Sequence, residues 1–448
     1  MKRHGHLFDR LVSFENLLAA AGTARRGKRF KANTARFEYQ LEPELLTLQD
    51  ELRSRTYRPG PYRTFTIREP KARLISAAPY RDRVVHHALC RVIEPIFERT
   101  FVKDSYACRV GKGTHLAVEV FQRHARRHPY VLKCDITKYF PSMDHAILFE
   151  LLARKLKDAR VLWLIRTIID ASNEQEWVCR HFPGDDLFTP VTRPKGIPIG
   201  NLTSQFFANV YLNGFDHFVK EDLCCSAYLR YCDDFVVFGD DKRALWAIKE
   251  AMGSYLVRLR LALHPRKCQV LPTRDGVDYL GYRVFPTHRR LRATTAKRSI
   301  RQLRRKARHC LRGTLPVGRF LQSLASWLGH AQHADTSGLR REVMGDLVAL
   351  IGDRVPLGED FSGKGWAGHG RSARRLLEQQ TAERAISEPE QQYADETERQ
   401  QRLPVREDSA VGDNRSARVS WAGAQESVPG GVYRPVPVLD AGSLAPAK

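Results

Sequence analysis

The chain has 448 residues, 42% of them hydrophobic, which allows two or three domains with substantial cores. Its formal net charge is +24, and the residues before 357 alone carry +26, so we expect the folded part to bind a polyanion such as nucleic acid, with a merely soluble basic surface as the alternative. The sequence predicts a cytoplasmic protein without disulfides or structural zinc, because it has no apolar run of about 18 residues, no signal-peptide core and nine cysteines in no paired spacing.

The first 60 residues alternate short apolar helical patterns with basic side chains, which indicates an N-terminal helical extension. Residues 61–286 mix strand-like runs with helical segments and predict an α+β domain. Within that domain, residues 130–136 are typical of a buried strand that carries Asp135 close to its end. An acid at that place is costly to bury unless it is paired or binds a metal ion.

A second acidic position lies in residues 227–241, where two β-rich runs are separated by Cys232, Asp233 and Asp234. This pattern predicts a tight hairpin with two acids at its tip. The pairs Asp185-Asp186 and Asp240-Asp241 are interpreted as ordinary turn or surface residues. The hairpin pair differs from them because apolar residues flank it on both sides.

If the strand that ends near Asp135 lies beside this hairpin, Asp135, Asp233 and Asp234 converge. Three carboxylates suit two Mg²⁺ ions roughly 3.5–4 Å apart, one activating a primer 3′-hydroxyl and the other holding a nucleoside triphosphate. We therefore expect a nucleotidyl transfer site at these three residues.

Residues 289–312 contain eleven Lys or Arg and no acid. At helical spacing their apolar residues form one stripe, and most of the basic residues, Arg301 and Arg305 among them, lie off it. This pattern predicts an amphipathic helix whose cationic face follows a sugar-phosphate backbone, with a solvated charged face as the alternative. A further apolar helix is expected over residues 320–328, and the segment 357–448 is expected to be mostly disordered.

The sequence YCDD at 231–234 resembles the Tyr-x-Asp-Asp box of reverse transcriptases, and CDITKYF at 134–140 resembles their first palm motif. Further motifs follow in the family's order: EPKARLISAAPYRDRVVHHAL (69–89), SYACRVGKGTH (105–115), GIPIGNLTSQFFANVYLN (196–213), LALHPRKCQV (261–270) and VDYLGYRVFP (277–286). The resemblance implies a right-hand polymerase with fingers and palm over residues 61–286 and a helical, basic thumb over residues 287–356.

The same resemblance implies roles for single residues, each with an ordinary surface or packing role as its alternative. In the fingers, Lys71, Arg73 and Arg83 would bind the triphosphate. Phe140 would lie under the sugar and select deoxynucleotides. The remaining implied roles are triphosphate binding by Gly200 and Gln205, a general acid for pyrophosphate at Lys267, a primer grip at Leu280, Gly281 and Tyr282, and a metal ligand at the backbone of Ile136.

The segment IPIGNLTSQ at 197–205 narrows the resemblance. Reverse transcriptases related to group II introns mostly have Gln and Pro where this chain has Ile199 and Gln205, and the form found here is similar to that of diversity-generating retroelements. That family implies error-prone copying at template adenines, to which the substrate-site residue Ile199 would contribute. It also implies a template RNA, a DNA or RNA primer, deoxynucleoside triphosphates and a small basic accessory protein.

Two alternatives stay open at this point. The chain resembles a group II intron-type or defence-associated reverse transcriptase in most of the same motifs. It could also be an inactive RNA-binding scaffold that kept the fold, although all three acids are present.

Overall fold

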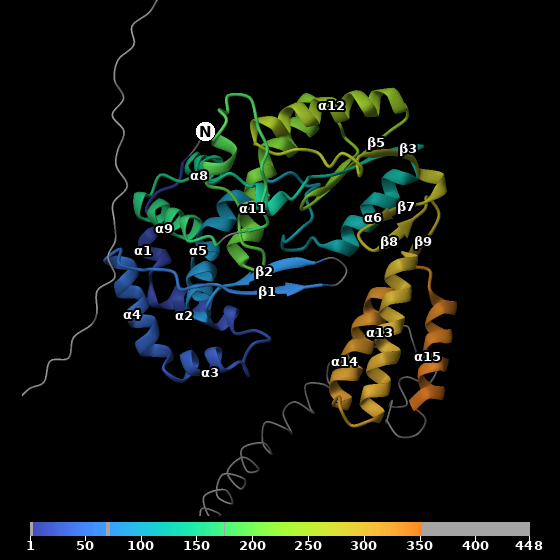
Figure 1. The fold of residues 1–448 in the computed structure, drawn as a ribbon, viewed down its shortest axis with the longest axis horizontal. Helices are drawn as coiled ribbons and strands as arrows, with labels where there is room; N and C mark the ends of the chain where they lie inside the picture. Colours follow the sequence, from blue (N-terminus) through green and yellow to red (C-terminus); the bar gives the residue numbers. More distant parts are fainter. Residues whose placement is uncertain (1–2, 69–71, 174, 352–448) are drawn as a thin grey trace, which may run out of the picture. The chain divides into compact units, whose positions relative to one another are not determined.

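The structure is a computed structural model that describes residues 3–68, 72–173 and 175–351 (Figure 1). The segment 357–448, for which disorder is predicted, lies outside the described residues, as do Lys71 and the last residues of the expected thumb. The described part combines helices with three antiparallel sheets, which confirms the predicted α+β class. No helix in these ranges is long and apolar enough to cross a membrane.

The N-terminal extension is helical, as predicted, and consists of α1 (Phe8–Leu11), α2 (Phe14–Ala24), α3 (Ala32–Tyr39) and α4 (Leu41–Arg53). The carboxylate of Asp158 links this extension to the central helices by hydrogen bonds. Asp158 caps a later helix and also accepts hydrogen bonds from the backbone N–H groups of Leu7 and Phe8. Two helix starts distant in sequence therefore share one cap.

The central helices surround the sheet that carries the acids. They are α5 (Tyr80–Glu98), α6 (Thr114–Ala125), α7 (Tyr139–Ser142), α8 (His145–Ala153), α9 (Ala159–Asp170), α10 (Thr189–Thr192), α11 (Leu202–His217), a π-helical turn (Phe218–Asp222) and α12 (Lys242–Arg258). Asp144 and Asp241 cap α8 and α12, because each carboxylate accepts hydrogen bonds from free N–H groups of the first turn.

The strands form three sheets. A two-stranded hairpin joins β1 (Arg63–Ile67) and β2 (Arg73–Ala77). The main sheet has the order β4-β5-β3-β6, with β3 (Tyr130–Asp135), β4 (Tyr228–Tyr231), β5 (Asp234–Gly239) and β6 (Gln269–Pro272). After a 3₁₀ turn (Thr273–Asp275), a small sheet consists of β7 (Val277–Tyr279), β8 (Tyr282–Val284) and β9 (Arg289–Leu291).

The main sheet separates two hydrophobic cores. Leu132 and Cys134 of β3 belong to the core that holds α5, α8 and α11, whereas Val131 belongs to the core formed with α6 and the small sheet. This alternation follows from the period of two in a strand, whose successive side chains point to opposite faces. Because β3 is covered on both faces, the strand and its last residue, Asp135, are held firmly.

Three helices follow the small sheet: α13 (Ala293–Leu311), α14 (Val317–Ala331) and α15 (Ser337–Ile351). The predicted apolar stripe is present, with Leu303 and Ala307 buried. The helix begins later than the basic segment does, because residues 289–291 form β9 and pair with β8. The expected second helix is α14, which packs in the same core.

Candidate active site

The turn between β4 and β5 carries two of the three acids. Tyr231 pairs with Asp234 across the hairpin, so the turn contains only Cys232 and Asp233, and Asp234 is the first residue of β5. The sequence predicted all three residues in the turn. Cys232 has a φ of 58°, a left-handed conformation that lets the chain reverse within two residues. On the other side of β5, Asp135 pairs directly with Asp234.

This pairing places the carboxylates of Asp135, Asp233 and Asp234 close enough for their negative charges to interact. Burial, together with the negative charges of Asp234 and Asp135, raises the pKa of Asp233 to about 6. The positive charge of Arg73 acts in the opposite direction. Like charges that are crowded in a partly buried position favour protonation or a bound cation. The donor set therefore fits hard divalent ions such as Mg²⁺.

Lys267 is the direct partner of Asp135, because its ammonium group forms an ion pair with that carboxylate. In residues 3–68, 72–173 and 175–351, no three His, Cys, Asp or Glu side chains stand in the arrangement of a ready-made metal site. The Lys267 side chain is 42% exposed and can move aside at little cost, so the ion pair is compatible with a cation at Asp135. Ile136 is buried, and its backbone bridges to Leu263.

A fully buried ion pair supports the Cys232–Asp233 turn from below, and sequence reasoning missed it. Arg230 forms two hydrogen bonds of 2.7 Å with Asp216 of α11, and neither side chain is exposed. A third donor, Arg230 Nη1, lies 3.2 Å from the carbonyl oxygen of Cys232 and 3.2 Å from Oδ1 of Asn209. The only signal in the sequence was an arginine inside an apolar strand, which requires a buried partner.

The segment with Ile199 and Gly200 contacts the β1–β2 hairpin. The carbonyl oxygen of Ile199 accepts a 2.9 Å hydrogen bond from the N–H of Ser76. Gly200 has a φ of 119°, and a Cβ added there would lie 3.0 Å from Cγ2 of Ile75. Only glycine fits this close approach without strain. Arg73, at the start of β2, is exposed.

Other predicted substrate residues lie in different settings. Phe140 is half-buried in α7, and Gln205 is exposed on α11. Arg83 is half-buried in α5, where its Nε donates to the carbonyl oxygen of Ala78. Burial lowers the pKa of Arg83. The guanidinium is therefore already partly engaged within the fold.

The predicted primer grip forms the turn between β7 and β8. Leu280 and Gly281 both have positive φ, 45° and 91°, as a two-residue hairpin turn requires. Tyr282 is wholly buried, and its hydroxyl lies 2.9 Å from Nδ1 of His330 in α14. The Tyr282 side chain therefore packs in the core beneath the turn, and Leu280 and Gly281 form the part of the turn that is partly exposed.

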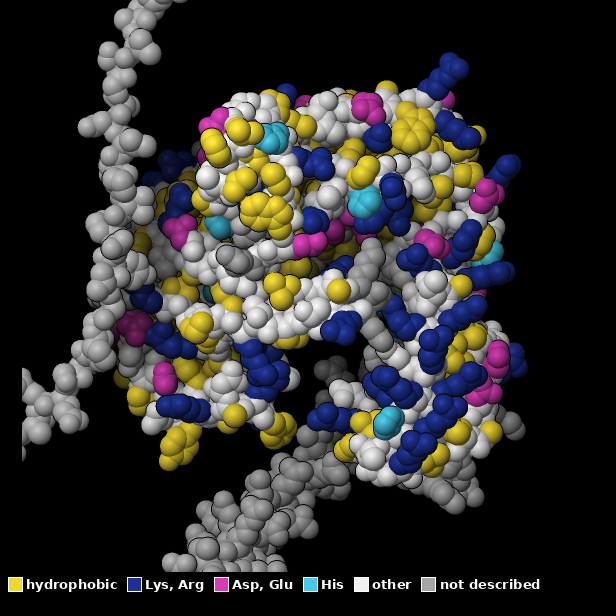
Figure 2. Space-filling view, in the orientation of Figure 1, with side chains coloured by type: hydrophobic (Ala, Val, Ile, Leu, Met, Phe, Trp, Pro, Cys, Tyr) yellow, Lys and Arg dark blue, Asp and Glu magenta, His cyan; other side chains and the backbone are white. Residues whose placement is uncertain are grey.

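The outward side of α13 is strongly cationic. Figure 2 shows a column of Lys and Arg side chains over the region of α13. Its exposed basic residues are Lys297, Arg301, Arg304, Arg305, Arg308 and Arg312. Arg304 is paired with Asp346 of α15, whereas Arg301 and Arg305 have no acidic partner among the described residues.

Comparison with known proteins gives a family match for the region that contains the three acids but not α13. Residues 67–284 match the family described as reverse transcriptase (RNA-dependent DNA polymerase). Protein YkfC of Escherichia coli K12 is 26% identical over 293 residues, which cover 56% of this chain and 74% of YkfC. The group II intron-encoded protein LtrA of Lactococcus lactis subsp. cremoris is 25% identical over 213 residues, which cover 47% of this chain but only 33% of LtrA.

Among solved structures, a Sicinivirus 3Dpol RNA-dependent RNA polymerase aligns with a TM-score of 0.43 and 15% identity, over 68% of this chain and 66% of that one. An apo telomerase from Candida tropicalis aligns with a TM-score of 0.42 and 10% identity, over 66% of this chain and 59% of that one.

Proposed function

We propose that the chain is an RNA-directed DNA polymerase that makes cDNA from a template RNA by two-metal nucleotidyl transfer, because residues 67–284 match the reverse transcriptase family. The proposal assigns metal binding to Asp135, Asp233 and Asp234, with the backbone of Ile136 as a further ligand. Its main support is the strand register that pairs Asp135 with Asp234, one residue from Asp233. Divalent ions bound there supply Lewis-acid activation of the primer hydroxyl and neutralise charge on the triphosphate.

In the proposed reaction, the primer 3′-oxygen forms a bond to the α-phosphorus and releases its proton to solvent, while the bond from that phosphorus to the pyrophosphate oxygen breaks. Lys267 is the candidate donor of a proton to the departing pyrophosphate. Its ion pair with Asp135 supports this role, since it keeps the ammonium group beside the acids before the substrate binds. Arg73 is the candidate contact to the triphosphate, supported by its electrostatic effect on Asp233.

The proposal also divides the chain by function. Residues 61–286 would form fingers and palm, and the described helices α13 to α15 would form a thumb that follows the template-primer backbone with Arg301 and Arg305. Leu280 and Gly281 would contact the primer, and Phe140 would exclude a 2′-hydroxyl. The supporting observations are the exposed cations of α13 and the hairpin turn at Leu280.

Primer extension tests the chemistry. The full chain is incubated with an RNA template, an annealed DNA primer, deoxynucleoside triphosphates and Mg²⁺. Asp233→Ala is expected to reduce incorporation by about 10³-fold, because a lost metal ligand removes several kcal/mol of transition-state stabilisation. Asp240→Ala is the matched control, since Asp240 is 74% exposed and its one ion pair among the described residues is with His128. An intact chain without metal-dependent incorporation would favour an inactive scaffold.

We further propose the diversity-generating type, with a small basic accessory protein as partner and frequent errors at template adenines. Support comes from Ile199 and Gln205, which stand where intron-type enzymes mostly have Gln and Pro. A specific observation favours the competing intron type: the relatives found include LtrA and the nuclear intron maturase 2 of Arabidopsis thaliana, which is 28% identical over 110 residues.

The substitution Ile199→Gln separates these two types. An amide at residue 199 can hydrogen-bond near the incoming nucleotide, so misincorporation opposite template adenine is expected to fall about tenfold. Sequencing of the cDNA products measures it, and Leu46→Gln, an exposed aliphatic of α4, is the control. An unchanged adenine error spectrum would argue against the role of Ile199, and faithful copying by the unmodified chain would favour the intron type.

A further inference from the structure

A cavity of about 210 Å³ lies beside the end of β3, outside the set of residues assigned above. Three segments distant in sequence enclose it: the turn after Asp135, the stretch that precedes α11, and the loop after α12. Five of its twelve lining residues are Lys or Arg, namely Lys138, Arg180, Arg193, Lys195 and Arg260, and none is Asp or Glu.

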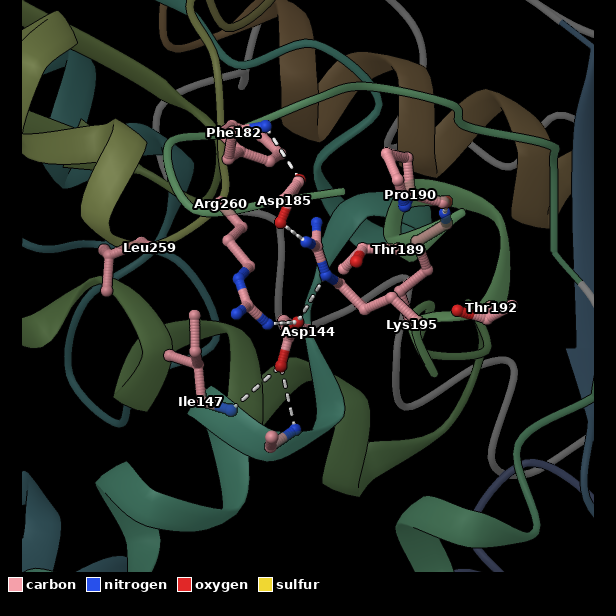
Figure 3. Close-up of polar contacts among 12 residues, drawn as sticks. Asp144, Ile147, Phe182, Asp185, Thr189, Pro190, Thr192, Lys195, Leu259 and Arg260 are labelled. Carbon is pink, nitrogen blue, oxygen red and sulfur yellow. Dashed lines mark hydrogen bonds and ion pairs between the residues drawn. The ribbon is translucent and has the colours of Figure 1, made fainter. Parts of the chain in front are cut away.

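Three acids balance part of this charge: Asp144 and Asp185 lie behind the lining, and the exposed Glu176 pairs with Lys138 at 2.9 Å. Asp144 accepts from Arg260 at 2.5 Å and lies 3.5 Å from Nε of Arg193. Asp185 pairs with the other end of Arg193. Figure 3 shows Arg260 directed at Asp144, and Asp185 beside Phe182, with dashed lines marking these contacts. Asp185 closes a turn, one of the two settings that the sequence predicted, because its N–H donates to the carbonyl oxygen of Phe182 at 3.0 Å; its side chain is only 3% exposed.

These acids leave one N–H donor of Arg193 without a hydrogen bond and Arg180 without a counter-charge among the described residues. The Nε–H of Arg193 is buried and makes no hydrogen bond, although the side chain is only 6% exposed. Burial, with the nearby charge of Arg193, lowers the pKa of Lys195. Arg180 is exposed and has no acidic partner in the part of the chain that the structure describes. Among the described residues, five lining cations thus face three paired acids, and an anion would neutralise the remaining positive charge.

The remaining lining has the chemistry of a phosphate site. Thr137 and Ser142 contribute hydroxyl groups, which donate long hydrogen bonds of 3.4 and 3.3 Å to backbone carbonyl oxygens and would donate to phosphate oxygens once a ligand binds. The guanidinium of Arg193 lies over the Phe182 ring at 5.8 Å and the ammonium of Lys195 over the Trp177 ring at 5.5 Å, so aromatic faces fix the direction of both cations. The volume exceeds that of one phosphate group and suits a chain of two or three.

The cavity shares one backbone segment with the candidate catalytic residues. Asp135 ends β3, and Thr137 and Lys138, only two and three residues later, line the cavity. The N–H of Thr137 donates to the carbonyl oxygen of Ala262, and the N–H of His264 donates to that of Asp135. The loop that closes the cavity is thus bonded to the strand end that carries Asp135, and a ligand in the cavity would lie next to the polymerase site.

We propose that this cavity binds the polyphosphate chain of a nucleotide substrate or of its product, at a place separate from the three carboxylates. The choice of polyphosphate rests on the proposed function. Two sources share this chemistry: the triphosphate of an arriving deoxynucleotide and the pyrophosphate that is released after each addition. Arg180, Lys195 and Arg193 would contact the phosphate oxygens.

Calorimetric titration of the full chain with inorganic pyrophosphate, in buffer with a chelator and no divalent ion, tests the site directly. Arg180→Glu and Lys195→Met are each expected to weaken binding about tenfold, the effect of losing one charge-assisted hydrogen bond. Arg274→Glu is the matched control, because Arg274 is 87% exposed and lies outside the cavity. Thermal unfolding of each variant checks that the fold is retained.

Steady-state kinetics separates the two sources. If arriving nucleotides use the cavity, Arg180→Glu raises both KM for the deoxynucleotide and the pyrophosphate concentration for half-inhibition, because the two ligands then compete for the same place. If departing pyrophosphate uses it, the concentration for half-inhibition by pyrophosphate rises and KM is unchanged. Both results support the site.

Three outcomes would overturn the proposal. The unmodified chain does not bind pyrophosphate, or Arg180→Glu and Lys195→Met both bind it as tightly as the unmodified chain does. In the third outcome, binding needs Mg²⁺ and is lost in Asp233→Ala. The last result would place the anion at the carboxylates. A chain that binds pyrophosphate in the cavity but never extends a primer would contradict the proposed function and leave the site standing.

Discussion

The Cys232–Asp233 turn and the outer face of α13 both depend on charged side chains. Those near the turn are buried and paired, whereas those on α13 are exposed and mostly unpaired among the described residues. Beneath the turn, Arg230 and Asp216 are fully buried and joined by two hydrogen bonds of 2.7 Å. On α13, Arg301 and Arg305 are exposed and have no acidic partner among the described residues. Buried charge fixes the geometry of a site, whereas exposed charge attracts a polyanion over a distance and is screened by salt.

The largest effect is expected from Arg230→Met, which removes the buried cation beneath the Cys232–Asp233 turn. We expect the free energy of unfolding to fall by about 3–5 kcal/mol, because Asp216 would remain buried without its partner. Cys232 would also lose a hydrogen bond to its carbonyl oxygen, so the Mg²⁺ concentration for half-maximal activity should rise. Urea unfolding and metal titration measure the two effects.

The double variant Arg230→Met, Asp216→Leu is the control for this experiment. It removes both charges together, so most of the lost stability should return, although Tyr228 would lose its 2.6 Å hydrogen bond to Asp216. If the single variant were as stable as the unmodified chain, the ion pair could not be what supports the turn.

The next effect concerns the turn itself. The pKa of Asp233 is raised to about 6 by burial and by Asp234 and Asp135, above its ordinary value of 3.8. A carboxyl with a raised pKa favours the folded state when protonated, and this contribution is lost as the pH rises from about 4 through about 6. In metal-free buffer at pH 8, Asp233→Asn should therefore stabilise the protein by about 2 kcal/mol.

Urea unfolding at pH 8 and at pH 4 measures this gain, which should nearly vanish at the lower pH. Asp240→Asn, at an exposed position, should change stability little at either pH. An equal effect of Asp233→Asn at both pH values would show that charge crowding is not its cause.

The smallest expected effects lie on α13. Arg301→Ala and Arg305→Ala should each weaken nucleic acid binding a few-fold and leave the unfolding free energy within about 0.5 kcal/mol. Each should also reduce the slope of log K against log salt by about 1. Filter binding at several salt concentrations measures the slope, with Arg274→Ala as a control. Unchanged slopes would favour a solvated face with no contact to a nucleic acid backbone.

The local sequence was sufficient for features that depend on neighbours along the chain. The apolar, β-rich runs predicted β3, β4 and most of β5, and the three-residue interruption predicted the turn that contains Asp233, although Asp234 belongs to β5. The stripe through Leu303 and Ala307 predicted α13. These predictions succeed because the apolar residues of a strand or helix follow the face or faces that it buries, so their spacing along the chain indicates the element.

Features that depend on partners distant in sequence could not be predicted in this way. The pairing of Arg230 with Asp216, the contact of Lys267 with Asp135 and the buried position of Asp185 each join residues from different elements. Residues 289–291 became β9 although their charge pattern continued that of the helix, because β8 offered an edge to pair with.

The sequence by itself determined which residues carry the candidate chemistry: three acids beside apolar strands and a basic helix in the order of a reverse transcriptase. Only the tertiary structure decided which charges are buried together, and it alone assembled the cationic cavity from three separate segments. The physical reason is that the energy of a charge depends on its burial and on the charges around it, and both are set by packing between elements rather than by the neighbours of a residue along the chain.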